Sequence, residues 1–314
     1  MSHNHHNHKH HSHSHGHHHH DAKDMKGWKI GVSILLNIII TVGQVIGAGI
    51  SGSVALMTDA LHNFSDVISL VISYVANKLT LKKATTSKTY GYKRAEILAA
   101  FINSATLIGV AIFLIIEAIE RFSSPIEIQA DIVIWFAIAS IVINFLSVVI
   151  LHKDSKDNMN IRSAYLHLLT DVMTSIAVMF GGLAMKYYNV FWIDGLLTLL
   201  IATYLIYSSF ALLKETTKVL MQFTPEGINL DEINTEISKI EGIKNLHHLH
   251  VWQLNDNKSM LEAHVEMDVD IMLSEFQEKL KEIENILHKF GIDHTNIQPE
   301  LNKCEKNDGL IANG

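Results

Sequence analysis

Residues 54–79, VALMTDALHNFSDVISLVISYVANKL, decide the fold, because they are apolar enough to form one membrane-crossing helix and yet contain several ionisable side chains. At 1.5 Å per residue, a helix of this length spans the ~30 Å hydrocarbon layer of a bilayer. Asp59, His62 and Asp66 all lie within it. Ionisable groups at such depth are costly and mark sites of function. The stretch therefore predicts a transmembrane helix that carries part of a binding site.

Five further apolar stretches share the length of this one. The six together are residues 30–50, 54–79, 95–119, 129–151, 163–185 and 190–213. Of the 314 residues, 48% are apolar and only 18% are charged, whereas about 25% charge is usual for soluble domains. We therefore expect an α-helical membrane protein whose six transmembrane helices occupy residues 28–214.

Basic residues outside these stretches are unevenly distributed, and this predicts the orientation of the chain in the membrane. One side receives nearly all of them: Lys9, Lys23, Lys26, Lys29, Lys78, Lys82, Lys83, Lys88, Lys93, Arg94, Lys153, Lys156, Arg162, Lys214 and Lys218. The other side has little beyond Arg121 and Lys186. We expect a multi-pass protein of the cell (inner) membrane with both termini in the cytoplasm.

Two of the stretches contain the same His-x-x-x-Asp spacing, His62 with Asp66 and His167 with Asp171. Residues four apart lie on one face of a helix. The predicted orientation makes the two helices antiparallel, which sets His62 level with Asp171 and Asp66 level with His167. Two imidazoles and two carboxylates suit tetrahedral Zn2+, and the carboxylates balance its charge. The alternative is two intrahelical hydrogen-bonded pairs that stabilise a helix bundle.

Two more acids count as candidates, whereas Glu96, Glu117 and Asp131 lie near the ends of their stretches. Asp59 lies one helical turn from His62 and is either a metal ligand on the release path or a group that orients His62. Asp194 lies nearer the outer end of the sixth stretch. The ionisable side chains deep in the membrane are thus concentrated on the second and fifth stretches, which is the pattern of a single intramembrane site.

The composition becomes soluble and amphipathic after Thr224 and Pro225. The periodicity predicts, in order, a helix over 230–240, a strand over 243–254, a turn over 255–258, a strand over 259–269, a helix over 271–289 and a strand over 294–301. The second strand alternates, with Leu261, Ala263, Val265, Met267 and Val269 on one face and Glu262, His264, Glu266 and Asp268 on the other. We expect a cytoplasmic α/β ferredoxin-like domain of αββαβ order over residues 222–302, able to dimerise through a sheet face.

Four segments carry a resemblance to a known family. They are SVALMTDALHNFSD at 53–66, YGYKRAEIL at 90–98, HLLTD at 167–171 and HHLHVW at 247–252. Together they resemble the cation diffusion facilitator family of divalent-metal transporters over about residues 28–301. The resemblance implies a homodimer, no enzymatic activity, and exchange of cytoplasmic metal for protons.

Carried onto this sequence, the resemblance assigns the transport site to His62, Asp66, His167 and Asp171, the pattern of zinc-preferring members. This chain has Gln44 and Gln222 where many relatives have acids.

A second candidate metal site lies in the soluble domain. His247 matches the first histidine of the family's H-x-L-H-V-W segment, His264 lies on the polar face of its strand, and Glu300 closes the third strand. These three residues either form a zinc site that bridges two protomers or are ordinary surface residues. Of the other histidines in this domain, His248 and His250 are assigned to the sheet surface, His288 to a solvated helix and His294 to the start of a strand. The group His152, Asp154 and Asp157 either passes metal inward or belongs to a solvated loop, and Cys304 is either a thiolate ligand or an idle free thiol.

The N-terminus has a separate composition, since 12 of the 21 histidines lie within the first 20 residues. We expect residues 1–24 to be a disordered cytoplasmic tail that attracts metal, with an expression tag as the alternative, and residues 303–314 to be a second tail. The single cysteine excludes a disulfide framework. The net charge of −7 excludes the basic surface that binding of nucleic acid requires.

The sequence therefore predicts efflux of divalent cations, chiefly Zn2+ with Cd2+ or Co2+ as further candidates, exchanged for external protons by alternating access at the His2Asp2 site. Two alternatives belong to other classes. One is an intramembrane zinc hydrolase, in which the same ligands would activate a water molecule. The other is a metal sensor whose helices only relay binding by the soluble domain.

Overall fold

The computed structural model of the chain describes residues 27–80, 82–152, 159–255 and 258–301. The two predicted tails, 1–24 and 303–314, lie outside these ranges, as do Asp154, Asp157 and Cys304. The chain divides into two compact units. One consists of residues 1–67 and 109–206, and the other of residues 68–108 and 207–314.

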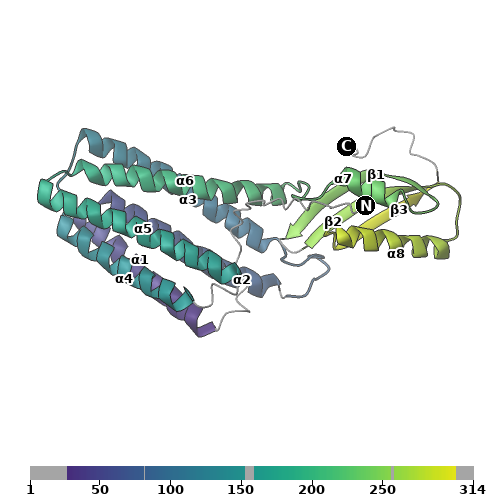
Figure 1. Cartoon of the computed structure of the whole chain (residues 1–314), viewed down its shortest axis with the longest axis horizontal. Coiled ribbons are helices and arrows are strands. Elements are labelled where there is room, and N and C mark those ends of the chain that lie inside the picture. The colour runs from purple at the N-terminus through teal and green to yellow at the C-terminus, as the bar shows by residue number, and fades with distance from the viewer. Residues whose placement is uncertain (1–26, 81, 153–158, 256–257, 302–314) are drawn as a thin grey trace, which may run out of the picture. The chain divides into compact units, whose positions relative to one another are not determined.

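Six long helices occupy the six apolar stretches (Figure 1). They are α1 (Gly27–Ser51), α2 (Val54–Thr80), α3 (Ala95–Ser123), α4 (Ala130–His152), α5 (Met159–Tyr188) and α6 (Trp192–Leu220). The largest difference from the predicted bounds is the end of α6, which continues to Leu220 instead of residue 213. Hydropathy marks only the apolar part of a helix, and the polar residues that follow in α6 include good helix formers such as Lys214 and Glu215.

Four of these helices are long and apolar enough to cross a membrane, judged by length and composition. The four segments are Ala95–Phe122, Ala130–Val149, Tyr165–Tyr188 and Trp192–Leu220. Within the described residues, α1 contributes a shorter apolar segment, Leu35–Ser51, and α2 with its buried acids is not among the four. Membrane crossing by α1 and α2 therefore stays a prediction.

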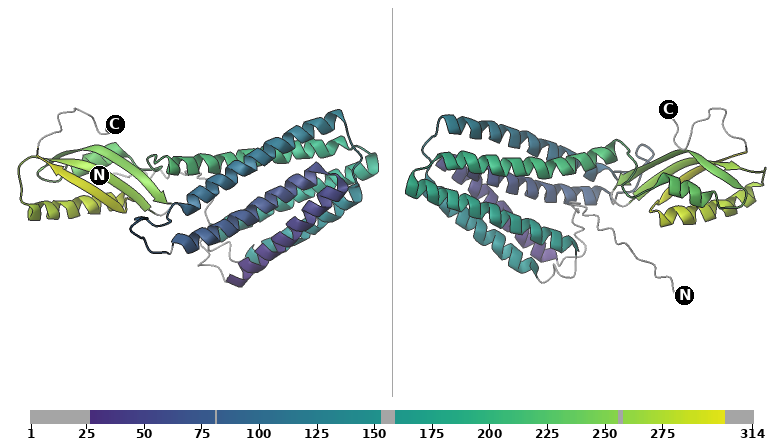
Figure 2. Two further views of the ribbon diagram at one scale, coloured as in Figure 1. Left: turned by 180° about the vertical axis from the view of Figure 1, so that it is seen from behind. Right: turned by 45° about the horizontal axis from the view of Figure 1, so that its top comes forward.

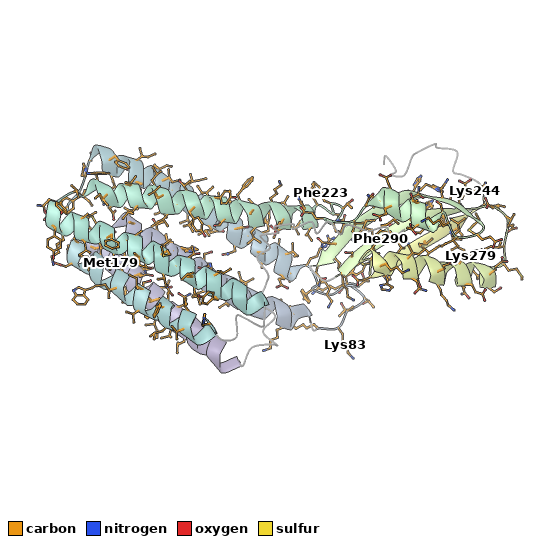
Figure 3. All side chains as sticks on the ribbon, viewed as in Figure 1. Lys83, Met179, Phe223, Lys244, Lys279 and Phe290 are labelled. Atoms are coloured by element: carbon orange, nitrogen blue, oxygen red, sulfur yellow. The ribbon has the colours of Figure 1, made fainter. Side chains whose placement is uncertain are left out.

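The long helices expose large apolar side chains. Trp135 of α4 is 70% exposed, Phe113 of α3 is 65% exposed and Phe180 of α5 is 61% exposed. Figure 3 shows side chains that are mostly carbon projecting all along these helices. So much exposed apolar surface is rare on a monomeric soluble protein and fits contact with lipid tails. The chain is a multi-pass membrane protein.

Close helix contacts in the first unit depend on glycine. Helix α4 packs against both α5 and α1 (Figure 2). A Cβ atom on Gly47 of α1 would lie 2.3 Å from the ring of Phe136 of α4, and one on Gly181 of α5 would lie 2.2 Å from Leu197 of α6. Small residues let helix backbones approach closely inside a membrane. These contacts help to fix the position of α5, which carries His167 and Asp171.

The second unit contains a small α/β domain (Figure 1). Its elements are α7 (Leu230–Ile237), β1 (Ile243–Asn255), β2 (Lys258–Met267), α8 (Leu273–Lys289) and β3 (His294–Glu300). The sheet order is β1-β2-β3, with β1 antiparallel and β3 parallel to β2. The αββαβ order predicted from the sequence is confirmed.

The core of this domain lies between the sheet and its two helices. Ile237, Val265 and Leu287 are fully buried there, and Phe290 packs against them (Figure 3). The alternation predicted for β2 is wrong at its end, because the strand stops at Met267 and Val269 is 60% exposed. The alternation also fails to describe the burial of Glu266. This residue is only 7% exposed, because Lys244 and Asn245 of the neighbouring strand contact its carboxylate.

Candidate metal centres

The His-x-x-x-Asp pairs of α2 and α5 come together as one group, here called the helix cluster (His62, Asp66, His167 and Asp171). Between the helices, His62 Nε2 lies 3.3 Å from Asp171 Oδ1, and His167 Nε2 lies 3.1 Å from Asp66 Oδ2. Within each helix the distances are 3.8 Å and 3.9 Å. The intrahelical distances are too long for hydrogen bonds. The crossed pairing expected from antiparallel packing is present.

Burial leaves several polar atoms of the helix cluster without hydrogen bonds. His62 is 6% exposed and Asp171 is 1% exposed, whereas the side chain of His167 is 41% exposed. Neither ring nitrogen of His62 and neither carboxylate oxygen of Asp171 has a hydrogen-bond partner within the described part of the chain. An unsatisfied buried polar group costs about 1–3 kcal/mol. A cation held between these atoms would remove that cost.

The spacing of the ligand atoms suits a small tetrahedral ion. Each residue of the helix cluster offers one nitrogen or oxygen, and these atoms all lie within 4.8 Å of one another. Bonds of 2.0–2.1 Å around tetrahedral Zn2+ place the ligand atoms about 3.3 Å apart. The four His–Asp distances of 3.1–3.9 Å lie around this value. Small side-chain movements therefore suffice to bring the four ligand atoms to bonding distance from one Zn2+ ion.

Asp59 belongs to a separate polar network beside the helix cluster. Its Oδ2 accepts hydrogen bonds from Gln44 Nε2 at 2.6 Å and from Ser175 Oγ at 3.3 Å. Gln44 Oε1 in turn accepts from Asn63 Nδ2 at 2.8 Å. Among the described residues, no hydrogen bond joins Asp59 to His62. Asp59 therefore does not orient His62 by direct contact, and uncharged partners from α1 and α5 hold it in place.

Asp194 of α6 caps the start of α2. Its Oδ1 accepts a hydrogen bond from Ser53 Oγ at 2.5 Å, and its Oδ2 accepts one from the Val54 N–H at 2.8 Å. The side chain is buried, with 1% exposure. A carboxylate at a helix N-terminus satisfies free N–H groups and interacts favourably with the helix dipole. This contact fixes the first turn of the helix that carries His62 and Asp66.

We expect Asp194→Ala to lower the melting temperature of the purified protein, because Ser53 Oγ and the Val54 N–H lose a buried acceptor at a cost of about 1–3 kcal/mol. Asp131→Ala is the control. The Asp131 side chain is 67% exposed and pairs with Lys186, and such surface pairs contribute only ~0–1 kcal/mol. Equal melting temperatures for the two variants, measured in the same detergent, would contradict a stabilising cap.

The α/β domain brings together a second group, here called the sheet cluster (His247, His264 and Glu300). His247 Nε2 lies 3.1 Å from Glu300 Oε2, and His264 Nδ1 lies 2.8 Å from Glu300 Oε1. His247 pairs directly with His264 across β1 and β2. One ligand atom from each residue lies within 4.8 Å of the others. Of the two readings open from the sequence, the proximity favours a metal site.

The remaining predicted candidates lie elsewhere, with one exception. His250, His288 and His294 are exposed, as predicted. His248 instead stacks on His264 with ring centroids 4.9 Å apart. Simple alternation from His247 would put His248 on the opposite face of the strand, so this contact could not be predicted from the pattern of the strand.

Comparison with known proteins relates both domains of the chain to one protein family. Residues 30–221 match the family described as "Cation efflux transmembrane domain", and residues 225–302 match "Cation efflux protein, cytoplasmic domain".

Three curated proteins illustrate the relationship. The "Cadmium, cobalt and zinc/H(+)-K(+) antiporter" of Bacillus subtilis is 36% identical, covering 86% of this chain and 87% of its own length. The "Metal cation efflux system protein CzcD" of Cupriavidus metallidurans is 32% identical, covering 85% of this chain and 84% of its own. The "Zinc transporter ZitB" of Pectobacterium atrosepticum is 33% identical, covering 84% and 82%.

Proposed function

Because the chain belongs to the cation efflux family of membrane transporters, we propose that it expels Zn2+ from the cytoplasm in exchange for external protons at the helix cluster. The observation that carries the proposal is the crossed His–Asp arrangement of α2 and α5. Similar proteins are named for cadmium, cobalt and zinc, so Cd2+ and Co2+ are further candidate substrates.

In the proposed cycle, metal and protons compete for the same atoms. Zn2+ binds the lone pairs of neutral His62 and His167 and the ionised carboxylates of Asp66 and Asp171. An ordinary histidine has a pKa near ~6.5, so protons from a more acidic outer side displace the metal from imidazole. Alternating access then exposes the protonated cluster to the cytoplasm, where the protons leave and metal binds again.

Charge movement explains why a driving ion is needed. Moving two positive charges outward against an inside-negative potential costs about 4.6 kcal/mol per 100 mV, and one incoming proton returns only about 2.3 kcal/mol. Export against a steep metal gradient therefore uses the chemical gradient of the proton as well, or two protons per cycle.

The proposal includes an arrangement of the whole chain. All six long helices span the membrane over residues 28–214, with both termini in the cytoplasm, and residues 222–302 form a ferredoxin-like domain that contributes to a homodimer. The described helix bounds and the αββαβ order support this arrangement. The match of residues 225–302 to a cytoplasmic domain supports the orientation, and bacterial relatives suggest the cell membrane. The tails at 1–24 and 303–314 are proposed to lie outside both domains.

Two other classes of function are less well supported. Catalytic zinc sites usually have three protein ligands and an open position for water, whereas four protein residues converge here. The family match identifies a transporter and not an enzyme. A pure metal sensor would not need buried ligands on α2 and α5.

Zinc flux in sealed vesicles that contain the purified protein tests the proposal directly. With the vesicle lumen made more acidic than the medium, we expect rapid zinc uptake from the cytoplasmic face of the protein and a matching loss of luminal protons. Collapse of the pH gradient with a protonophore should abolish concentrative uptake. Zinc uptake that is the same with and without the gradient would rule out proton exchange.

We also propose that the sheet cluster binds zinc and favours association of the cytoplasmic domains. Its three side chains converge on one point, and the two oxygens of Glu300 face different histidines. The side chain of His264 is 22% exposed and that of Glu300 is 15% exposed, so an ion can reach them from solvent. Metal bound to the folded, associated form stabilises that form by mass action.

We expect zinc to raise both the melting temperature and the dimer fraction of residues 222–302, and His264→Ala to reduce both effects. At zinc concentrations about 100 times the dissociation constant, the stabilisation should approach ~2.7 kcal/mol. His288→Ala, on the exposed side of α8, is the control. Calorimetry and sedimentation measure the two effects, and equal zinc stabilisation of both variants would show that His264 is not a ligand.

A further inference from the structure

Strand β1 contains a bulge beside the sheet cluster. Its pairing with β2 shifts between His247 and His250, and His248 lies in the shift with a φ of +51°. Leu246 before the bulge and Leu249 after it are both buried in the core. One extra residue in a strand makes two neighbours point the same way. The bulge therefore returns β1 to its core-facing register and leaves His248 on the same side as His247.

The ring of His248 lies among the rings of the sheet cluster. Its centroid is 4.9 Å from that of His264, with the planes 10° apart, and 5.6 Å from that of His247. His248 Nε2 and His247 Nδ1 are buried and have no hydrogen-bond partner among the described residues. The ring of His248 thus lies beside the sheet cluster with an unsatisfied nitrogen, although the ligand atoms that lie within 4.8 Å of one another come from His247, His264 and Glu300, so a rotation of the His248 ring is needed to bring its nitrogen to the same ion.

The backbone at His248 adds an independent observation. A φ of +51° lies in the left-handed region, which glycine and asparagine adopt more readily than histidine does. Residues held in such conformations cluster at binding sites, where the surrounding structure fixes a side chain in a position that regular backbone would not give it. The strained residue here is the one whose imidazole reaches the sheet cluster.

We propose that His248 is a further metal-binding residue, which completes a site of three nitrogens and one carboxylate oxygen with His247, His264 and Glu300. This inference rests on the proposed cytoplasmic site. Zn2+ and Co2+ both accept such a tetrahedral set. With His248, four protein groups are available to surround the ion.

The visible absorption of Co2+ bound to the protein tests the assignment, after the other metal-binding groups have been removed. The parent protein lacks residues 2–20, carries His62→Ala and Asp171→Ala in the helix cluster, and carries Cys304→Ser, which removes the only thiol of the chain. Four-coordinate Co2+ absorbs visible light much more strongly than six-coordinate Co2+. Titration therefore reports both the affinity and the geometry.

We expect His248→Asn to weaken Co2+ binding about tenfold or more, since even residues that only support a ligand contribute about 10–100-fold. Asparagine tolerates the left-handed backbone, so this variant keeps the bulge. His250→Asn, the same change at an exposed position of β1, should leave binding unchanged. His248→Cys should restore tight binding and add a sulfur-to-cobalt charge-transfer band, which appears only when residue 248 coordinates the metal.

The outcomes separate the two proposals. Tight four-coordinate binding that His248→Asn leaves unchanged, together with no charge-transfer band in His248→Cys, would overturn the role of His248 and leave the three-residue site intact. Absence of four-coordinate binding in the parent protein would overturn both the sheet cluster site and this inference.

Discussion

Asp171→Asn is expected to reduce zinc efflux by about a hundredfold or more while the protein remains folded and dimeric. Asp171 is 1% exposed, and its carboxylate faces His62 at 3.3 Å and His167 at 3.9 Å, so its charge is available to balance a cation bound between them. Removal of one partner from a buried charged pair costs about 3–5 kcal/mol, and each 1.4 kcal/mol corresponds to about a tenfold change in affinity. Asparagine keeps the volume of the side chain, so packing of α5 should be preserved.

Asp131→Asn is the matched control, because the Asp131 side chain is 67% exposed at the start of α4. Vesicle flux, with the amount of folded protein measured by size-exclusion chromatography, compares the two variants. Normal zinc flux in Asp171→Asn would remove this residue from the transport site. Loss of flux in both variants would indicate a general effect of charge removal.

His62→Asp is expected to change the order of metal preference from zinc towards oxygen-preferring ions such as Mn2+. The variant exchanges one of two imidazoles for a third carboxylate in the helix cluster. Imidazole suits Zn2+, whereas carboxylate oxygens suit Mn2+ and Mg2+. A third negative charge also stabilises the metal-bound site relative to the empty, deprotonated site. Zinc turnover should therefore fall even where zinc still binds.

Competition between Zn2+ and Mn2+ for uptake into vesicles measures the ranking. His152→Asp, at the exposed end of α4, makes the same chemical change away from the helix cluster and should keep the wild-type ranking. An unchanged ranking in His62→Asp would show that His62 does not touch the metal.

The helix cluster was predictable because an α-helix has a fixed repeat. Residues four apart share a face whatever surrounds the helix, and the predicted succession of membrane-crossing stretches makes α2 and α5 antiparallel. Those two facts are enough to pair His62 with Asp171, as the 3.3 Å distance confirms. The order of the α/β domain was predictable for a similar reason, since alternation and helical spacing are local signals.

Features that depend on distant partners were not predictable. Asp194 attracted attention as an acid in an apolar stretch, but its partner Ser53 lies in the link before α2, far away in the sequence, and no spacing links the two. Gln44 appeared only as a departure from the family, although it joins Asp59 and Asn63 in one network. The bulge at His248 depends on the register between β1 and β2, which single-strand alternation does not contain.

Asp194 holds the first turn of α2 in place, so a tilt of that helix pivots near Val54. The displacement of each residue of α2 then grows with its distance from Val54. At 1.5 Å per residue, His62 lies about 12 Å and Asp66 about 18 Å from Val54, so a tilt of about 5° moves them by about 1 Å and 1.6 Å. Zinc–ligand distances tolerate only about 0.2 Å. A tilt of about 5° would therefore be enough to break the coordination of a metal ion held at the proposed transport site, and it would move Asp66 further than His62.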